Sequence, residues 1–152
     1  MKNPKKILIA NRGVIAIRAL RAAKELGYQV ASVYSTIDKD QKHLKLSDEA
    51  ICIGPAASKD SYLNEAAIIA AAELVGADAI YPGYGFLAEN SSFAEKCNQS
   101  GFKFVGPDPK VIEIMGDKIK AKELIESLGV PIVPGYTGNI QSQDQIENIV
   151  DE

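Results

Sequence analysis

The stretch KILIANRGVIAIRALRAAKELGYQVASVY, residues 6–34, decides the fold class because it joins two apolar runs through one helical segment. The runs at 6–10 and 29–34 are apolar nearly throughout, without clean alternation, as is typical of parallel strands covered on both faces. The segment between them begins near Gly13, where Asn11 can cap a helix, and Gly27 can end it. The stretch therefore predicts a β-α-β unit.

The same alternation continues along the chain. Three further apolar runs read as strands, at 50–54, 77–82 and 102–106, and helical segments at 64–76 and 90–99 separate them. Repeated β-α-β units predict an α/β fold: a Rossmann-like, doubly wound parallel sheet of about five strands with helices on both faces. Sheets of this kind bind ligands at the carboxyl ends of their strands.

Beyond residue 106 the pattern changes to helix upon helix. Residues 109–116 predict one helix, and 117–129 predict a second, capped by Asp117 and closed by Gly129. After an extended, proline-rich segment, Ser142 and Gln145 form a capping-box pattern for a last helix without a stop signal. We expect a first domain over 1–115, then a linker helix and the start of a second, truncated domain over 116–152.

Composition excludes several classes of protein. The chain has 152 residues with 46% hydrophobic residues and no apolar run near 18 residues, so we expect no membrane span. A net charge of −3 without a basic tract makes nucleic acid a poor partner. Cys52 and Cys97 have no metal-binding spacing and read as small buried residues in a reducing, cytoplasmic compartment. We interpret His43, in a polar segment, as a solvated loop residue.

The stretch YPGYGFLAEN, residues 81–90, is the first candidate site. It follows the fourth predicted strand, on the ligand side of the sheet. Gly83 and Gly85 permit unusual backbone angles, and Tyr84 between them offers a ring and a phenol. Glu89 lies favourably near the start of the next helix. The pattern favours a binding loop, while a turn with one packing aromatic residue stays open as the alternative.

The helix at 13–26 carries two stripes of residues. Ile15, Ala19, Ala22 and Leu26 form the stripe that we expect to face the sheet. A second stripe is formed by Arg18, Arg21 and Glu25. Because arginine suits fixed carboxylate pairing, these residues favour an interface; a solvated face with an internal Arg21–Glu25 pair is the alternative.

Phosphate binding is predicted at one other place. The first strand leads into its helix without G-x-G-x-x-G, and a P-loop is absent, which disfavours a dinucleotide cofactor. Lys118 lies in the first turn of the helix at 117–129, where the helix dipole is also positive. Both attract an anion such as phosphate. An exposed lysine without a ligand is an equal alternative from the residues alone.

Taken together, these stretches resemble the biotin carboxylase family, the first domain of the ATP-grasp subunit or module of acetyl-CoA, pyruvate and propionyl-CoA carboxylases. The resemblance runs from about Lys5 to Tyr136. It is carried, in order, by KILIANRG with IRALRAAKELG, YPGYGFLAEN with FAEKC, FVGP, and MGDKIKAK with GVPIVPGY. Four motifs in register are far more specific than any one of them.

The resemblance implies a pre-ATP-grasp domain of an ATP-dependent ligase. Tyr84 and Gly85 would face biotin, and Lys118 would contact ATP phosphate. Arg18, Arg21 and Glu25 would lie at a homodimer interface. The full enzyme would use ATP and bicarbonate to make carboxyphosphate, whose CO2 passes to biotin on a carboxyl carrier protein and then to a carboxyltransferase. Mg²⁺ or Mn²⁺ would be held by carboxylates outside this chain.

Two departures from the family pattern stand out. Val14 occupies a position where the family usually has an acid, which removes a favourable charge from the helix start. The chain also stops at Glu152, before the family's ATP lid, metal ligands and acid/base groups. We therefore expect no catalytic residue within this chain and no carboxylase activity from it alone.

Two other functions remain open from the sequence. The first is the pre-ATP-grasp domain of another ligase, of the purine or carbamoyl-phosphate type, in which biotin has no part and the Tyr84 loop serves another ligand. The second is a non-enzymatic flavodoxin-like module such as a receiver domain. A receiver would need clustered acids after the first strand, where this chain has Asn11 and Arg12.

Overall fold

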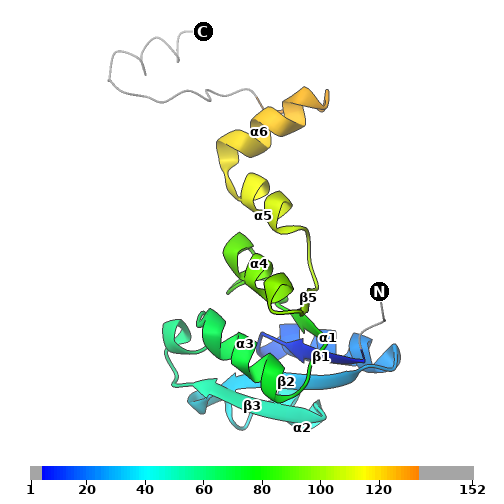
Figure 1. Cartoon of the computed structure of the whole chain (residues 1–152), viewed down its shortest axis with the longest axis vertical. Helices are drawn as coiled ribbons and strands as arrows, with labels where there is room; N and C mark the ends of the chain where they lie inside the picture. Colours follow the sequence, from blue (N-terminus) through cyan, green and yellow to red (C-terminus); the bar gives the residue numbers. More distant parts are fainter. Residues whose placement is uncertain (1–4, 134–152) are drawn as a thin grey trace. The chain divides into compact units, whose positions relative to one another are not determined.

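A five-stranded parallel sheet forms the centre of the fold in the computed structural model, which describes residues 5–133. Its strand order is β3-β2-β1-β4-β5, and every neighbouring pair is parallel (Figure 1). The strands are β1 Lys6–Ile9, β2 Gln29–Ser35, β3 Glu49–Gly54, β4 Ala79–Tyr81 and β5 Lys103–Phe104. Each strand falls on one of the five predicted runs, although β2 and β3 each extend one residue beyond their run, and this agreement confirms the doubly wound fold class.

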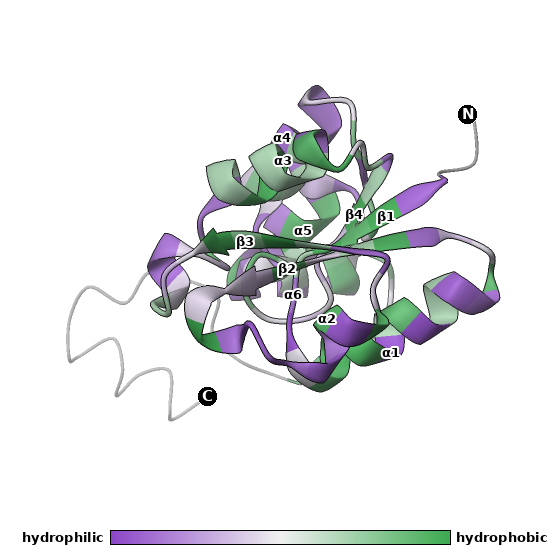
Figure 2. Ribbon diagram, turned by 90° about the horizontal axis from the view of Figure 1, so that it is seen from below, coloured by the Kyte–Doolittle hydropathy of each residue, from purple (hydrophilic) through white to green (hydrophobic). Residues whose placement is uncertain are grey.

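Helices cover the sheet on both faces. Figure 2 shows α3 and α4 on one face and α1 and α2 on the other. The helices are α1 Gly13–Glu25, α2 Lys42–Leu46, α3 Glu65–Leu74, α4 Ser91–Gln99, α5 Pro109–Gly116 and α6 Lys118–Ser127, with 3-10 turns η1 Thr36–Asp38 and η2 Ser58–Asp60. The short α2, η1 and η2 were not predicted, because three to five residues are too few to show a helical period.

The larger part of the core lies between the sheet and the pair α3 and α4. Fully buried Leu8, Ile80 and Phe93 belong to it, and the rings of Phe93 and Phe104 meet edge to face with centroids 6.1 Å apart. Asn64 and Asn90 cap α3 and α4 by accepting from the amides of Ala67 and Phe93. Packing and capping thus fix the elements on either side of the 81–90 loop.

Helix α1 packs on the opposite face through a stripe that was not predicted. Ala16, Leu20 and Ala23 are buried against Ile9 and Val30. The predicted sheet-facing stripe is wrong: Ile15 and Ala19 are half-buried, whereas Ala22 and Leu26 are exposed. Small residues at positions 16 and 23 allow the helix to approach the sheet closely, and this contact outweighs the larger side chains of the neighbouring stripe.

Two single-residue interpretations are also wrong. His43 lies on α2 and is fully buried, with its Nε2 3.3 Å from the Val33 carbonyl oxygen. Cys97 is buried as expected, but Cys52 is exposed on β3, an edge strand of the sheet. The lysines around His43 are exposed, whereas Leu46 packs against the core on the same short helix, so the polar composition of the segment hides its inward face.

The chain divides by its internal contacts into two units, residues 1–113 and 114–152. In the second unit the structure describes α6, which Asp117 caps as predicted. The predicted helix after Ser142 and Gln145 lies outside the described residues. Within residues 5–133, no helix is long and apolar enough to cross a membrane.

Candidate functional site

The candidate site lies at the carboxyl ends of β1 and β4. These strands are neighbours at the centre of the sheet. From β1 the chain continues to β2 and β3 on one side, and it then returns to form β4 and β5 on the other side. Such a switch point is where doubly wound sheets bind ligands. The loop after β1 contains Asn11 and Arg12, and the loop after β4 contains Pro82, Gly83 and Tyr84. The topology therefore brings the predicted binding loop to the expected place.

Asn11 fastens the two loops together. Its buried Nδ2 donates to the carbonyl oxygens of Pro82 at 2.8 Å and Tyr84 at 3.0 Å, while its Oδ1 accepts from the Arg12 amide at 2.8 Å. The prediction that Asn11 caps α1 is therefore wrong. Arg12 is the N-cap residue and makes no capping hydrogen bond through its side chain. Asn11 is turned away from the helix amides because it binds the 82–84 backbone instead.

The glycines of the loop have two different tasks. Gly83 has φ +73°, and a Cβ there would lie 2.6 Å from Ile15 Cγ2 and 2.9 Å from Asn11 Nδ2. This close approach to Asn11 and α1 is what makes glycine necessary. Gly85 has φ +70°, but a Cβ there would meet nothing within 4 Å. Gly85 thus leaves open space beside the backbone.

Tyr84 between these glycines has 68% of its surface exposed. Its carbonyl oxygen is fixed by Asn11, so its backbone is held while its ring remains free to meet a ligand. Glu89 is exposed, immediately before the Asn90 cap of α4. The role of Tyr84 and Gly85 in ligand binding stays a prediction, now with a defined geometry.

A buried polar cluster beneath the loop was missed from the sequence. Asp38 accepts from Ser35 Oγ at 2.7 Å, Tyr62 Oη at 2.8 Å and Arg12 Nη1 at 3.2 Å, all at Oδ2. Its Oδ1 accepts from Gln41 Nε2 at 2.9 Å. The signal that could have found it is the stretch STID, residues 35–38, which begins at the last residue of β2, together with the NR that follows β1.

The protonation states in this cluster follow from its hydrogen bonds. Burial alone would raise the pKa of Asp38, but the hydrogen bonds from Ser35, Tyr62 and Arg12, with the charge of Arg12, hold that pKa below its ordinary value. Burial, reinforced by the Asp38 carboxylate, raises the pKa of Tyr62 to about 12. At neutral pH the cluster is therefore an ionised carboxylate facing a phenol donor and a guanidinium.

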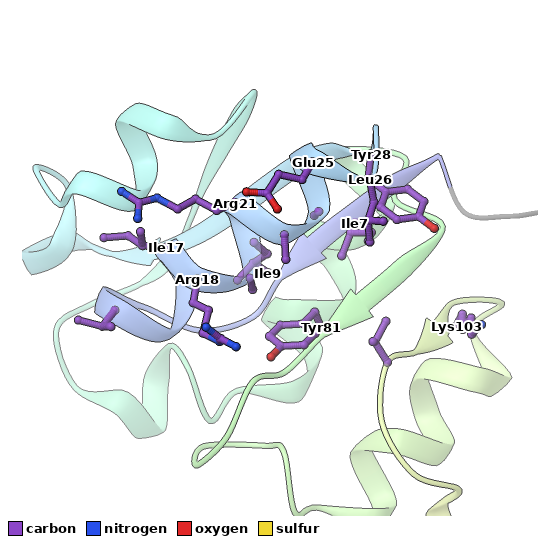
Figure 3. Close-up of a pocket in the computed structure, with 15 residues that line it drawn as sticks. Ile7, Ile9, Ile17, Arg18, Arg21, Glu25, Leu26, Tyr28, Tyr81 and Lys103 are labelled. Carbon is purple, nitrogen blue, oxygen red and sulfur yellow. The ribbon is translucent and has the colours of Figure 1, made fainter.

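A groove beside α1 contains the predicted interface residues. Figure 3 shows Arg18, Arg21 and Glu25 along α1, and Tyr81 and Lys103 line the same groove. The groove has a volume of about 830 Å³, and the exposed side chains of Val14 and Leu26 also line it. Among the ion pairs within residues 5–133, none joins Arg21 to Glu25. The alternative of an internal pair is thus not what the structure shows.

Lys118 is exposed in the first turn of α6, within the second unit. The Asp117 carboxylate accepts from the amides of Ile119 at 3.0 Å and Lys120 at 3.1 Å. Because these amides are occupied, the helix start offers less to an anion than the sequence suggested. What remains is the Lys118 ammonium, at the edge of a shallow apolar hollow that includes Met115 and Ile125.

Metal binding finds no support in the described part of the chain. Residues 5–133 contain no group of three or more His, Cys, Asp or Glu side chains that could hold a metal ion.

Comparison with known proteins identifies relatives over nearly the whole chain. The family model described as "Biotin carboxylase, N-terminal domain" matches residues 3–112. Biotin carboxylase of Haemophilus influenzae is 58% identical over 137 residues, which cover 90% of this chain and 31% of that protein. Biotin carboxylase 1 of Bacillus subtilis is 53% identical over 148 residues, covering 97% of this chain and 33% of the relative. The chain thus spans about a third of the length of these relatives.

Solved structures give the same result. A biotin carboxylase from Campylobacter jejuni, solved as a complex with a β-γ-ATP ligand, matches with a TM-score of 0.93 and 50% identity, over 98% of this chain and 33% of that one. The biotin carboxylase domain of a Hydrogenobacter thermophilus 2-oxoglutarate carboxylase was solved as a dimer with MgADP, ADP and bicarbonate. It matches with a TM-score of 0.92 and 47% identity, over 99% of this chain and 33% of that one. These matches favour a biotin carboxylase domain over a domain of another ATP-grasp ligase and over a receiver module.

Proposed function

Because the chain belongs to the biotin carboxylase family, by its match to that family's N-terminal domain, we propose that it serves in an ATP-dependent ligase that carboxylates biotin. In this proposal bicarbonate and MgATP are the other substrates, and biotin is presented on a carrier protein for transfer to a carboxyltransferase. The relatives' shared name supports biotin carboxylation, and the MgADP and bicarbonate of one similar structure support the other substrates. The chain contributes binding surfaces, and we assign the bond-making chemistry to parts of the enzyme outside residues 5–133.

Biotin is assigned to the loop after β4, and this loop is the observation that carries the proposal. Tyr84 is exposed at the switch point, while Asn11 holds its backbone. The side of Gly85 where a Cβ would project is empty, so a flat, uncharged ring can approach the backbone closely. The Tyr84 phenol can then donate or accept one hydrogen bond at the edge of the ureido ring.

ATP phosphate is assigned to Lys118 through its charge alone. The ammonium is exposed, and its three donors suit a phosphate oxygen. The neighbouring Asp117 carboxylate caps α6 and would repel an anion at the helix amides. We therefore propose that Lys118 contacts phosphate from its side chain, without help from the helix start.

Self-association is assigned to the groove beside α1. Arg18, Arg21 and Glu25 are exposed there, next to apolar side chains that include Leu26. Two-fold pairing would allow an arginine of one copy to meet Glu25 of the other, which is the arrangement expected of an isologous interface. The dimer seen in a similar structure supports this assignment. We also propose a cytoplasmic location, which the two free thiols support.

The test uses a hybrid carboxylase in which this chain replaces the matching segment of the Haemophilus influenzae relative. ATP-dependent carboxylation of free biotin is measured for the hybrid and for Tyr84→Phe within it. Because a neutral hydrogen bond contributes about 0.5–1.5 kcal/mol, we expect the KM for biotin to rise about 2- to 10-fold, with the KM for ATP unchanged. Tyr28→Phe is the control, since Tyr28 lines the α1 groove instead. Unchanged biotin KM and turnover in Tyr84→Phe would remove the biotin assignment.

A further inference from the structure

The buried carboxylate of Asp38 lies at the centre of a contact chain that ends in the 82–87 loop. Asp38 is 3% exposed and accepts four hydrogen bonds from side chains, three at Oδ2 and one at Oδ1. Its ion pair with Arg12 joins this buried carboxylate to a guanidinium side chain that is 39% exposed, and such a pair contributes little net stability compared with well-packed apolar side chains. Stability alone is therefore a poor account of why an aspartate, with Arg12 as its partner, occupies this position.

Two of the donors to Asp38 also hold Phe86. The Tyr62 and Phe86 rings are stacked, with centroids 4.9 Å apart and an angle of 14° between their planes. The Arg12 guanidinium carbon lies 5.2 Å from the Tyr62 ring centroid and 5.6 Å from that of Phe86. A cation at this distance is attracted to both ring faces. Asp38, Arg12, Tyr62 and Phe86 thus form one contact unit, which we call the Asp38 cluster.

The backbone of Phe86 needs such support. Phe86 has φ +42° and is the one non-glycine residue with positive φ within residues 5–133. An L-residue in this region is strained and stays there only when its surroundings fix it. Gly85 precedes it with φ +70°, so the direction in which the loop presents Tyr84 and Gly85 depends on where Phe86 is held. The Asp38 cluster holds Phe86 by its ring.

We propose that Asp38 is a positioning residue for the 82–87 loop, acting through Arg12 and Tyr62 on Phe86. Asn11 fixes the first part of the loop at the carbonyl oxygens of Pro82 and Tyr84, and the Asp38 cluster fixes its second part. Tyr84 and Gly85 lie between these two anchors. Only the identity of the ligand rests on the proposed function, because the positioning itself is a property of this chain.

The experiment measures the loop directly by backbone ¹⁵N relaxation of the 152-residue chain. Asp38→Asn keeps the shape but removes the charge that holds Arg12. Tyr62→Phe keeps the ring but removes the donor to Asp38 and the acceptor of the Ser35 amide. In both variants we expect the order parameters of the Gly85 and Phe86 amides to fall from about 0.85 towards about 0.6.

Asp48→Asn is the matched control, because Asp48 accepts instead from Lys24 Nζ and the Val30 amide. We expect the 82–87 loop of the Asp48→Asn variant to remain as rigid as in the unchanged chain. A folded Asp38→Asn variant with an equally rigid loop overturns the proposal. If Asp38→Asn does not fold, Tyr62→Phe decides, and a rigid loop there also overturns it.

The hybrid carboxylase then separates this inference from the proposed function. With a loosened loop, we expect Asp38→Asn to raise the KM for biotin roughly tenfold while the KM for ATP stays the same. A loosened loop with an unchanged KM for biotin supports positioning by Asp38 and overturns the biotin assignment. A rigid loop with a raised KM for biotin overturns the positioning role, because the effect would then reach the site by another route.

Discussion

Gly83 shows most directly how a single residue shapes the site. Its positive φ costs an L-residue about 1–2 kcal/mol, and a Cβ would clash with Ile15 and Asn11, which adds about 1–3 kcal/mol of overpacking. We expect Gly83→Ala to lower the free energy of unfolding by about 2–5 kcal/mol in urea denaturation. Gly85→Ala is the control, with a cost of about 1–2 kcal/mol, because its Cβ would meet nothing. Equal costs at the two positions would contradict this account.

Two buried titratable groups make stability depend on pH in separate windows. Burial lowers the pKa of His43, although the Val33 carbonyl and the Asp38 charge oppose that shift. The unfolded chain then binds the proton more readily, so stability should fall as pH drops below about 6.5. The pKa of Asp38 is also lowered, so its contribution persists until pH falls through about 4 and below.

Denaturation midpoints measured between pH 3 and pH 8 test this division. His43→Gln should make the denaturation midpoint nearly independent of pH above about pH 5, and it should leave the fall in stability below about pH 4 unchanged. Asp38→Asn should weaken the fall in stability below about pH 4. The variant should therefore be less stable than the unchanged chain at neutral pH, and this difference in stability should shrink in acid. A slope above pH 5 that survives His43→Gln would show that another group titrates there.

Single residues were the hardest to predict, and Asn11 shows why. An asparagine before a helix is a good capping residue, so local chemistry predicts a cap. Its real partners lie more than 70 positions away, at Pro82 and Tyr84, and only the pairing of β1 with β4 brings them close. The Asp38 cluster was missed for the same reason, since Asp38 meets Arg12 and Tyr62, 26 and 24 positions away, only after the sheet has formed.

At the scale of elements, local signals predicted most of the structure. The apolar runs gave the strands, and Asn64, Asn90 and Asp117 were in position to cap the helices that follow them. The face of α1 could not be predicted, because alanine is common on both of its stripes and a shift of one residue rotates the helix by about 100°. Helix position thus follows from local chemistry, whereas helix orientation depends on the partner surface.

Asp117 gives a prediction at this scale. Its carboxylate caps α6 at two amides, so Asp117→Ala should cost about 1 kcal/mol locally and raise amide hydrogen exchange along Lys118–Ser127 about 5-fold. Asp117→Asn is the control, because asparagine caps equally well without the charge. Faster exchange in the asparagine variant would mean that the charge, and not the hydrogen bonds, supports the helix start.

At the scale of the whole molecule, the strand order decides where the sites lie. The central pair β1 and β4 places the loop with Tyr84 at one end of the sheet, and the groove beside α1 lies along one face. The sequence predicts parallel strands and therefore a ligand-binding end, which explains why the loop could be predicted before its contacts were known. The groove could not be predicted, because it depends on how far α1 covers the sheet.

That groove carries the last prediction. If it is the dimer interface, burying Leu26 in each copy contributes about 1.5–3 kcal/mol, so Leu26→Asp should weaken self-association of the hybrid carboxylase at least about tenfold. Leu74→Asp is a matched control, since Leu74 lies on α3 and is 75% exposed, against 74% for Leu26. Analytical ultracentrifugation over a concentration series measures the self-association of both variants. Because Leu74 is exposed on α3, which covers the opposite face of the sheet, equal weakening by the two variants would rule out the α1 groove as the interface and point to a general loss of stability.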